Sequence, residues 1–455
     1  MKDSKTIQLI SDLKKKFPFV GKSLFIGTRI LYGFKFLLDT TILKLKYWRK
    51  YGKIDFNKTC YVHPEKIQYF IKNRRYFNWN NSFRIMDGDW DLNKEPIDDL
   101  LIISSIKQRF VEGKKWEEIE IFNLIPTKQS KVKKIWTFKN EEVRDKYLKE
   151  IDSFYLKIKM NGYKSQKELY SFKERIIQSE WKPILDEIVV AIDRDGQLLF
   201  INGKHRLGVA KVLNIPKIPI IFLLRHKKWM IFRKNLTGFS KTLQGRKLYQ
   251  NPIHPDLQDI PYKYGELSYN LIKRNLLLSQ GTFLDINANI GYFCHKFEDD
   301  GFECYAAEKN QNCLYFLKKL KKAENKRFEI ISESIFNYKG NQELNFNVIL
   351  ALNIFRDFMT VKEMYIKLAE FLKRLNVQEM FIGLDKPSRF RSKKYHLLNE
   401  PEKILKFILE KSSLNEFKYI GELEDGRHIY KLTSDKSYNS FNYHEIIQDI
   451  TINLM

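Results

Sequence analysis

The stretch Gly281-Thr-Phe-Leu-Asp-Ile-Asn-Ala-Asn-Ile-Gly-Tyr-Phe-Cys-His-Lys-Phe297 contains an apolar run, a turn of small residues and a second apolar segment. This order predicts a buried strand that leads through a tight turn into a helix. The backbone of such a turn can approach a ligand closely, and the helix N-terminus offers unpaired N–H groups. We therefore expect a ligand site at Asp285–Gly291.

A carboxylate follows at a suitable distance from this turn. In Gly301-Phe-Glu-Cys-Tyr-Ala-Ala-Glu308, a predicted strand ends in an acid 17 residues after Gly291. An acid in this position can accept hydrogen bonds from both hydroxyls of a ribose, as in dinucleotide-binding folds. The two features together predict a cofactor that contains a nucleoside.

Strand and helix patterns alternate along residues 262–435. The expected strands are 282–286, 304–308, 328–331, 347–352, 379–384, 417–423 and 427–432. Helical patterns separate the first five, and the last two would form a hairpin across Glu424-Asp425-Gly426. Alternation followed by a hairpin predicts an α/β fold with a mainly parallel seven-stranded sheet and one antiparallel strand.

Residues 262–435 resemble the class I S-adenosylmethionine-dependent methyltransferases, in particular those whose first motif reads L-D-x-G-A-N-x-G-Y-F. The resemblance implies a Rossmann-like sheet and S-adenosylmethionine as the cofactor. It also implies that Asp285 and Gly291 shape the methionine side of the pocket, that Glu308 holds the ribose and that Asn353 lies at the mouth. The cofactor-binding residues implied in this way are Asp285, Asn287, Asn289, Gly291, Glu308 and Asn353.

One residue departs from the pattern of that family. Asn287 stands where the family usually has glycine. Asparagine tolerates a positive φ better than most residues, so the turn can form. Its side chain would fill space beside the cofactor, which leaves open a non-catalytic scaffold with degenerate sites.

The methyl acceptor is less clearly indicated. The Asn/Asp-Pro-Pro-aromatic motif of amino-group methylases is absent after the fourth strand, where Asn353-Ile-Phe-Arg-Asp-Phe358 stands instead. Asp357, Asp385 and His396 are candidates for a general base towards a hydroxyl, with a surface or structural role as the alternative. We expect a small-molecule or glycan-like substrate.

A second signal lies in the N-terminal half. Residues 187–224 predict two strands joined by a turn, then Asn202-Gly-Lys-His-Arg206, a short helix over 207–213 and a third strand. The glycine permits close approach, and the three basic side chains and the helix N-terminus supply donors. This combination predicts a phosphate site, and its residues are Gly203, Lys204, His205 and Arg206.

Residues 187–226 resemble the ParB/sulfiredoxin superfamily, whose members carry a G-x-H-R or G-x-R-R element in the same strand–turn–helix. The resemblance implies an α+β domain that grips nucleotide phosphates, here a nucleoside triphosphate or diphosphate with Mg²⁺. Lys204 occupies the position of the reductase's catalytic cysteine, which disfavours that chemistry. No helix-turn-helix pattern follows, which disfavours specific DNA binding.

Phosphoryl transfer would need carboxylates to hold Mg²⁺ or to act as a base. The densest acidic cluster upstream is Asp87-Gly-Asp-Trp-Asp91. Asp89 and Asp91 are therefore candidate metal ligands, and together with His205 they are the candidate catalytic residues. The alternative is a polar turn around a packed Trp90.

The net charge of +26 is concentrated in two stretches. Residues 1–50 contribute +9, and residues 201–250, which contain no acid, contribute +12. Such a concentration favours polyanionic partners, namely nucleotide phosphates, nucleic acid or anionic lipid. The alternative is a solvated basic face, and nucleic acid is not the favoured partner.

Residues 17–50 combine dense apolar residues with recurring cations. A helix on an anionic membrane surface has this composition, and so does a helix packed on its own domain. No uncharged apolar segment of 18 or more residues predicts a membrane span. The four cysteines form no C-x-x-C pair, and there is no signal-peptide pattern. We therefore expect a cytoplasmic protein, with peripheral attachment to the inner face of the membrane as the alternative.

These features divide the chain into five parts. A basic helical lead-in (1–60) precedes the ParB/sulfiredoxin-like domain (61–230), which includes a helix predicted over 141–161. A basic to Pro-rich connector (231–261) leads to the methyltransferase-like domain (262–435) and a tail (436–455). The functional expectation is a methyltransferase coupled to a nucleotide-binding or kinase module. The alternative is a nucleic-acid-associated protein that uses residues 201–250.

Overall fold

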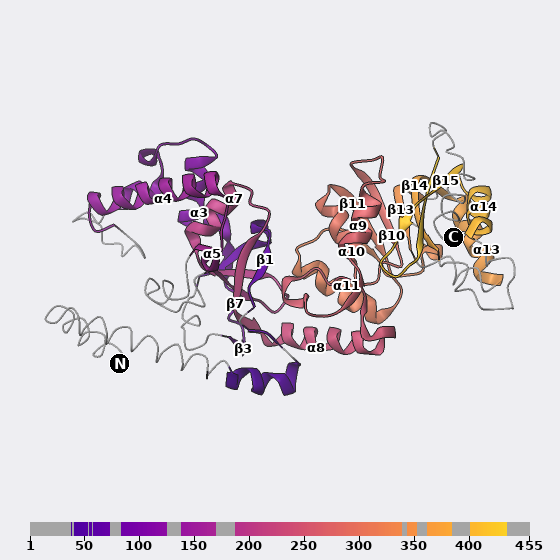
Figure 1. The fold of residues 1–455 in the computed structure, drawn as a ribbon, viewed down its shortest axis with the longest axis horizontal. Helices are drawn as coiled ribbons and strands as arrows, with labels where there is room; N and C mark the ends of the chain where they lie inside the picture. The colour runs from indigo at the N-terminus through magenta and orange to yellow at the C-terminus, as the bar shows by residue number, and fades with distance from the viewer. Residues whose placement is uncertain are drawn as a thin grey trace, which may run out of the picture. The chain divides into compact units, whose positions relative to one another are not determined.

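The structure is a computed structural model of the 455-residue chain, and its described residues fall into two compact units, 1–237 and 238–455. The described residues are 38, 41–52, 54–56, 58–72, 83–124, 138–169, 187–338, 344–352, 362–384 and 401–434. Figure 1 shows both units, each with its own sheet and helices. Among the described residues, no helix combines the length and the apolar character that crossing a membrane requires.

Part of the predicted lead-in lies within the described residues. Residues 41–51 are helical, and the exposed large apolar side chains on and just before this helix are Leu38, Ile42, Leu45 and Trp48. Their spacing of three to four residues places them along one helix face. Residues 17–37 lie outside the described residues, so the membrane-surface role stays a prediction.

A seven-stranded mixed sheet forms the core of the first unit. Its order is β1 (Cys60–Val62), β7 (Ile218–His226), β5 (Ile188–Ile192), β6 (Leu198–Asn202), β2 (Ile67–Ile71) and β4 (Lys94–Pro96), while β3 (Arg84–Met86) also pairs with β7. β5 is antiparallel to β6 and parallel to β7. The strand–turn–strand–helix–strand order predicted for residues 187–224 is confirmed.

This sheet is accompanied by the α-helices α3 (Leu101–Phe110), α4 (Glu141–Asn161), α5 (Gln166–Leu169) and α7 (Lys204–Val212). The helix predicted over 141–161 is α4: the side chain of Asn140 accepts a hydrogen bond from the Val143 N–H at its start, and Gly162 (φ 75°) ends it. Helix α3 packs closely on α7, because a Cβ at Gly208 would lie 2.8 Å from Ile106 Cδ1. Short 3₁₀ turns complete the unit, η1 (Pro64–Lys66), η4 (Ile97–Asp99), η5 (Trp116–Glu118) and η6 (Glu120–Asn123).

The segment predicted as a connector, 231–261, is structured. Most of helix α8 (Lys227–Thr242) lies in it, and the boundary between the units falls after Thr237. It continues through η8 (Gln244–Arg246), β8 (Leu248–Gln250) and η9 (Pro255–Leu257). β8 then pairs in parallel with β9 (Tyr262–Tyr264), so this part of the predicted connector belongs to the second unit rather than to a linker.

The second unit contains a doubly wound sheet. Its order is β12 (Glu329–Ile331), β11 (Phe302–Ala307), β10 (Gly281–Ile286), β13 (Leu344–Ala351), β14 (Leu375–Leu384), β16 (His428–Thr433) and β15 (Glu416–Glu422). The first five strands are parallel, and the β15–β16 hairpin is antiparallel to β14. The chain winds outwards from β10 and returns on its other side at β13. The second unit is therefore Rossmann-like, with its switch point between β10 and β13, where such folds bind ligands.

Helices cover both faces of this sheet (Figure 1). One buried cluster joins the sheet to α13 (Lys362–Lys373) and α14 (Pro401–Lys411). A second cluster joins it to α9 (Glu266–Lys273), α10 (Tyr292–Asp299) and α11 (Gln311–Ala323), while η10 (Ile335–Asn337) follows β12. Strand boundaries differ from the predicted ones by a few residues, most at β14, which begins at Leu375 rather than at 379.

Candidate functional site

The turn after β10 has the left-handed backbone that the sequence predicts. Asn287 and Asn289 have φ angles of 65° and 54°. The backbone N–H groups of Asn287 and Ala288 both donate to the carbonyl of Ala307, at 2.8 and 3.0 Å, and tie the turn to the end of β11. Asparagine therefore takes a conformation that most residues avoid, and the turn forms without a glycine at position 287.

Gly291 is required by packing. It is the N-cap of α10 with φ 85°, and a Cβ on it would lie 2.3 Å from Leu317 Cδ1 of α11. It is not among the residues that line the pocket described below. The structure thus gives Gly291 a role in seating α10 on α11, and a direct role at the methionine side stays a prediction.

Glu308 secures the same turn. Its Oε2 accepts a hydrogen bond from the Asn289 N–H at 2.9 Å, and its Oε1 accepts one from the Asn310 N–H at 2.7 Å. The side chain is 3% exposed; burial raises its pKa, and the amides of Asn310 and Asn289 oppose that rise. An ionised carboxylate has about four lone-pair positions, so acceptor capacity remains. Ribose binding by Glu308 stays a prediction, because Glu308 is outside the pocket lining.

Asp285, the penultimate residue of β10, is the most unusual group of this region. It is 3% exposed, and its Oδ2 has no hydrogen-bond partner among the described residues. Burial, and after it the nearby Glu308, raise the pKa of Asp285 well above its ordinary value. Buried polar atoms are rarely left without a partner, so this oxygen is free to accept a hydrogen bond from a bound ligand.

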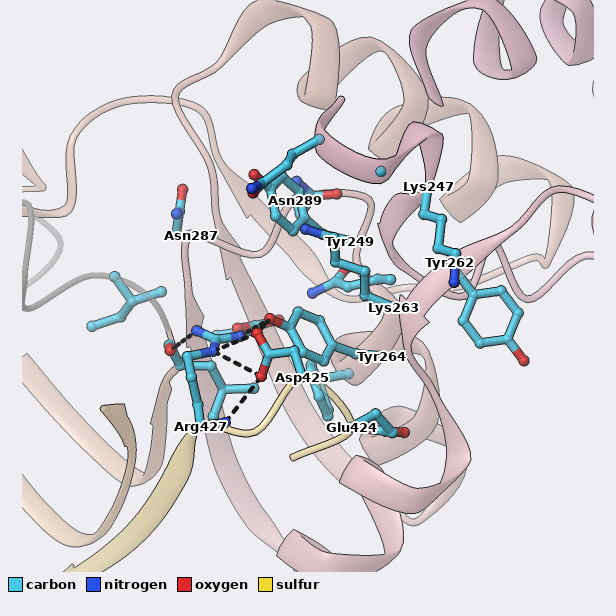
Figure 2. A pocket seen from close by; sticks show the side chains of 17 residues that line it. Lys247, Tyr249, Tyr262, Lys263, Tyr264, Asn287, Asn289, Glu424, Asp425 and Arg427 are labelled. Carbon is cyan, nitrogen blue, oxygen red and sulfur yellow. Dashed lines mark hydrogen bonds and ion pairs between the residues drawn. The ribbon is translucent and has the colours of Figure 1, made fainter. Parts of the chain in front are cut away.

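Asp285 lines a pocket of about 1000 Å³ at the carboxyl ends of the parallel strands. Figure 2 shows Asn287 and Asn289 of the turn on one side of it, and the side chains of β8, β9 and the β15–β16 hairpin on the others. Phe293 of α10 and Leu352, which follows β13, complete the wall near the switch point. Ligand pockets usually measure about 300–1000 Å³, so this one has room for a large ligand or for two.

A buried ion-pair network forms the wall opposite the turn. The Arg427 Nε lies 3.0 Å from Asp425 Oδ2, and the guanidinium also donates to the Tyr264 hydroxyl and to the Leu352 carbonyl. The Tyr264 hydroxyl donates to Asp425 (Figure 2). Burial would raise the pKa of Asp425, but the charge of Arg427 and the hydrogen bonds from Tyr264 and Arg427 outweigh it and hold the pKa below its usual range.

Glu424 fixes the hairpin turn to the start of α9. Its carboxylate accepts hydrogen bonds from the backbone N–H groups of Gly265 (3.2 Å) and Ser268 (3.3 Å), and also from the Ser268 hydroxyl. A carboxylate at a helix N-terminus is favoured by the unpaired amides there. The predicted hairpin across Glu424–Gly426 thus builds one side of the pocket.

Sequence reasoning missed the contribution of β8 and β9 to this pocket. Lys247, Tyr249, Lys263 and Tyr264 line it. The first two lie in 231–261, which was expected to be a connector, and the other two lie at the start of 262–435, where no strand was predicted before 282. The alternation of Lys247-Leu-Tyr-Gln250 and of Tyr262-Lys-Tyr264 was the available signal for short strands. Two three-residue strands that pair in parallel carry too little pattern to be predicted as a unit.

In the first unit, α7 begins at Lys204 rather than at 207, so Lys204, His205 and Arg206 form its first turn instead of preceding it. Gly203 is the N-cap with φ 97°. His205 Nε2 lies 2.6 Å from the Tyr147 hydroxyl, and burial, followed by the charges of Lys204 and Arg206, lowers the pKa of His205 to about 4. His205 is therefore neutral at pH 7.

The cationic side chain of Arg206 has a partner in the protein. Its Nη1 lies 3.4 Å from Glu187 Oε2, and Glu187 Oε1 also accepts a hydrogen bond from the Gln166 N–H at 2.7 Å. The Tyr163 hydroxyl is buried near this pair without a hydrogen-bond partner among the described residues. Phosphate binding at Gly203–Arg206 stays a prediction.

The acidic cluster Asp89–Asp91 faces a guanidinium. Arg194 Nη2 lies 2.7 Å from both Asp89 Oδ1 and Asp91 Oδ1, and its Nε donates to Asp91. Among the described residues, no group of three or more His, Cys, Asp or Glu side chains could hold a metal ion. This geometry matches a polar turn around a buried Trp90.

The three candidate catalytic residues Asp89, Asp91 and His205 do not meet. Arg194, which holds both aspartates, precedes β6, whereas His205 follows that strand. Five extended residues at about 3.3 Å each separate the two ends by about 16 Å. A single site that joins the acidic cluster to Gly203–Arg206 is therefore not formed in this structure.

Four predicted residues, Asn353, Asp357, Asp385 and His396, lie outside the described part of the chain. Their roles at the pocket mouth or as a general base stay predictions.

Comparisons with known proteins complete the description of the site. No family model and no curated protein matches the chain. Among solved structures, the bifunctional kinase-methyltransferase WbdD is 15% identical with a TM-score of 0.34, over 45% of this chain and 47% of that chain. This chain thus spans about half the length of that structure.

Two further similarities are weaker still. PH0226 from Pyrococcus horikoshii OT3 is 11% identical with a TM-score of 0.30, over 36% of this chain and 87% of that one. Magnesium protoporphyrin IX methyltransferase (ChlM) from Synechocystis PCC 6803, solved with bound SAM, is 8% identical with a TM-score of 0.29, over 45% of this chain and 82% of that one. These TM-scores all lie below 0.5, so the function is inferred from this chain's own geometry.

Proposed function

We propose that the second unit is an S-adenosylmethionine-dependent methyltransferase that binds the cofactor between the turn after β10 and the β8–β9 wall. One observation carries this proposal: Asp285 Oδ2 is buried without a partner in the described residues, beside the pocket at the switch point. A buried carboxyl group with no partner is costly, and a ligand that donates a hydrogen bond or carries a positive charge removes that cost. The ammonium group and the ribose hydroxyls of S-adenosylmethionine are donors of this kind.

The residues of the chain fit such a cofactor. Asn287 and Asn289 present side-chain amides to the pocket from a turn with left-handed backbone. Glu308 holds that turn through the Asn289 N–H, so it acts on the pocket through the turn. The bound cofactor would supply a methyl group on a sulfonium, and the protein would bind it, orient it and keep water from it. A hydroxylated or glycan-like molecule remains our proposal for the acceptor.

Calorimetric titration with S-adenosylhomocysteine, which lacks the transferable methyl group, tests this proposal. We expect saturable binding to the wild type and a loss of at least about tenfold in affinity, near 1.4 kcal/mol, for Asp285→Asn. Asp299→Asn is the matched control, since Asp299 lies at the end of α10 with 65% of its side chain exposed. If the wild-type protein binds neither S-adenosylhomocysteine nor S-adenosylmethionine, the proposal is overturned. The non-catalytic scaffold with degenerate sites would then be the remaining interpretation.

We propose phosphate or nucleotide binding at Gly203–Arg206 as a second function, which one observation favours. The Tyr163 hydroxyl is buried next to Arg206 and Glu187 without a hydrogen-bond partner in the described residues. A phosphate oxygen could accept from this hydroxyl and from Arg206 if the ion pair with Glu187 opened. We further propose that a nucleotide bound there with Mg²⁺ would donate a phosphoryl group, in an activity coupled to that of the methyltransferase unit.

Thermal unfolding with ATP, ADP or CTP and Mg²⁺ tests this second function. We expect one of these nucleotides to raise the unfolding temperature of the wild type. The shift should vanish in Arg206→Ala and persist in Lys217→Ala, which removes an exposed cation just before β7. A shift that persists in Arg206→Ala, or no shift with the wild type, contradicts phosphate binding there.

A further inference from the structure

The pocket of the second unit has a basic wall that the cofactor does not explain. Lys247 precedes β8 and is exposed, while Lys263 lies in the middle of β9 and is half-buried. Figure 2 shows both side chains on the β8–β9 side of the pocket, with Tyr249 beside Lys263. The Lys263 ammonium lies 4.7 Å from the centre of the Tyr249 ring, which holds the ammonium at the wall by a cation–π interaction.

The acidic side chains of the pocket do not neutralise these two lysines. Asp425 is paired with Arg427, and Glu424 accepts hydrogen bonds at the start of α9. Asp285 lines the pocket from β10, and burial favours its neutral form. Within the described residues, no ion pair joins Lys247 or Lys263 to a carboxylate. The β8–β9 wall therefore carries two positive charges towards the pocket.

The charge of this wall does not match the proposed cofactor. S-adenosylmethionine has a sulfonium, an ammonium and a carboxylate, so its net charge at neutral pH is positive. Two lysines directed at a ligand with a net positive charge would weaken its binding, because like charges repel. A pocket of about 1000 Å³ has space for a second ligand beside the cofactor.

We propose that Lys247 and Lys263 bind an anionic group, a phosphate or a carboxylate, of the methyl acceptor. This inference rests on the proposed methyltransferase function and narrows its acceptor to an anionic molecule. An ammonium is a point donor that suits either anion. The ring of Tyr262 also lines the pocket and offers a flat surface to a sugar or another cyclic part of the same molecule.

Ligand-observed NMR on protein saturated with S-adenosylhomocysteine tests this inference. The probes are glucose 6-phosphate and glucuronate, which carry the two anions on a sugar, and glucose, which carries none. We expect at least one anionic sugar to bind more tightly than glucose, with an affinity that falls as NaCl concentration rises. Lys247→Gln and Lys263→Gln should each weaken that binding by about tenfold, as expected for the loss of a charge-assisted hydrogen bond.

Two control variants are measured in the same way. Lys263→Arg retains the charge and should keep most of the affinity, and Lys318→Gln removes an exposed cation of α11 and should change nothing. Equal binding of glucose and of both anionic sugars, or binding unchanged in both Lys→Gln variants, overturns the inference. Binding of S-adenosylhomocysteine is measured in the same samples. If it is intact while anion binding fails, only the acceptor inference is lost; if it is absent, the proposed function itself fails.

Discussion

Two glycine turns of this chain share a local geometry and differ in their surroundings. Gly203 (φ 97°, ψ 33°) and Gly291 (φ 85°, ψ 19°) each follow a strand region and cap a helix, α7 and α10. After Gly203, His205 contacts Tyr147 and Arg206 contacts Glu187, so protein groups occupy these side chains. Before Gly291, Asp285 and the asparagines of the turn face a pocket of about 1000 Å³.

A strand–glycine–helix turn is therefore a scaffold for a site and does not form a site by itself. Both glycines are required by packing, because a Cβ would meet Ile188 Cγ1 at 3.1 Å or Leu317 Cδ1 at 2.3 Å. The pocket beside Gly291 depends on elements remote in sequence, the β8–β9 pair and the β15–β16 hairpin. What surrounds each turn therefore decides whether a ligand has room.

The largest effect is expected from the network that builds the pocket wall. Arg427→Met removes a buried cation, leaving the half-buried Asp425 without its partner and the Leu352 carbonyl without this donor. Breaking a buried ion pair costs about 3–5 kcal/mol; because water still reaches Asp425, we expect urea unfolding to show a loss of about 3–4 kcal/mol. The double variant Arg427→Met/Asp425→Leu should recover part of it; a single variant as stable as the wild type contradicts the role given to this network.

Glycine replacements compare the two turns directly. Gly291→Ala combines a strained φ with a Cβ far inside contact distance of Leu317, and we expect about 3 kcal/mol of destabilisation from strain and overpacking. Gly203→Ala meets Ile188 at a longer distance and should cost about 2 kcal/mol. Gly301→Ala is the control, since its φ is 97° with nothing within 4 Å, and should cost about 1 kcal/mol. Denaturant unfolding that gives the reverse order would refute the packing argument.

His205, in the turn after Gly203, should make the free energy of unfolding depend on pH. The pKa of His205 is lowered to about 4 in the folded protein, whereas an unfolded histidine titrates near 6.5. Between these values the unfolded chain binds the extra proton, so stability falls by up to about 1.4 kcal/mol per pH unit as pH decreases from 6.5 to 4. In His205→Asn, this contribution to the change of stability with pH should be absent. Identical slopes in the two proteins would exclude His205 as the source.

Asp285 should make the stability of the protein change with pH in the opposite direction. Burial raises its folded pKa, so the unfolded chain releases the proton first as pH rises, and stability falls above about pH 4. Asp285→Asn cannot ionise, and its unfolding temperature should exceed that of the wild type at pH 7, with a difference that shrinks towards pH 4. A variant less stable than the wild type at pH 7 would show that Asp285 has a partner in the folded protein.

Much of the second unit could be predicted from the sequence, because buried parallel strands and their helices carry strong local patterns. The turn at Asp285–Gly291, the left-handed Asn287 and the hairpin at Glu424–Gly426 were all predictable. The site was harder, because charge partners are set by tertiary packing. Nothing local to Asp91 indicates Arg194 as its partner, and nothing local to Lys263 indicates that β9 lines the pocket.

The central claim is that a ligand fills the pocket beside Asp285. A crystal structure with S-adenosylhomocysteine tests this claim most directly. We expect ligand density between the Asn287–Asn289 turn and the β8–β9 wall, with a donor atom within hydrogen-bond distance of Asp285 Oδ2. Density only elsewhere on the chain, or a pocket that stays empty at saturating ligand, would contradict it.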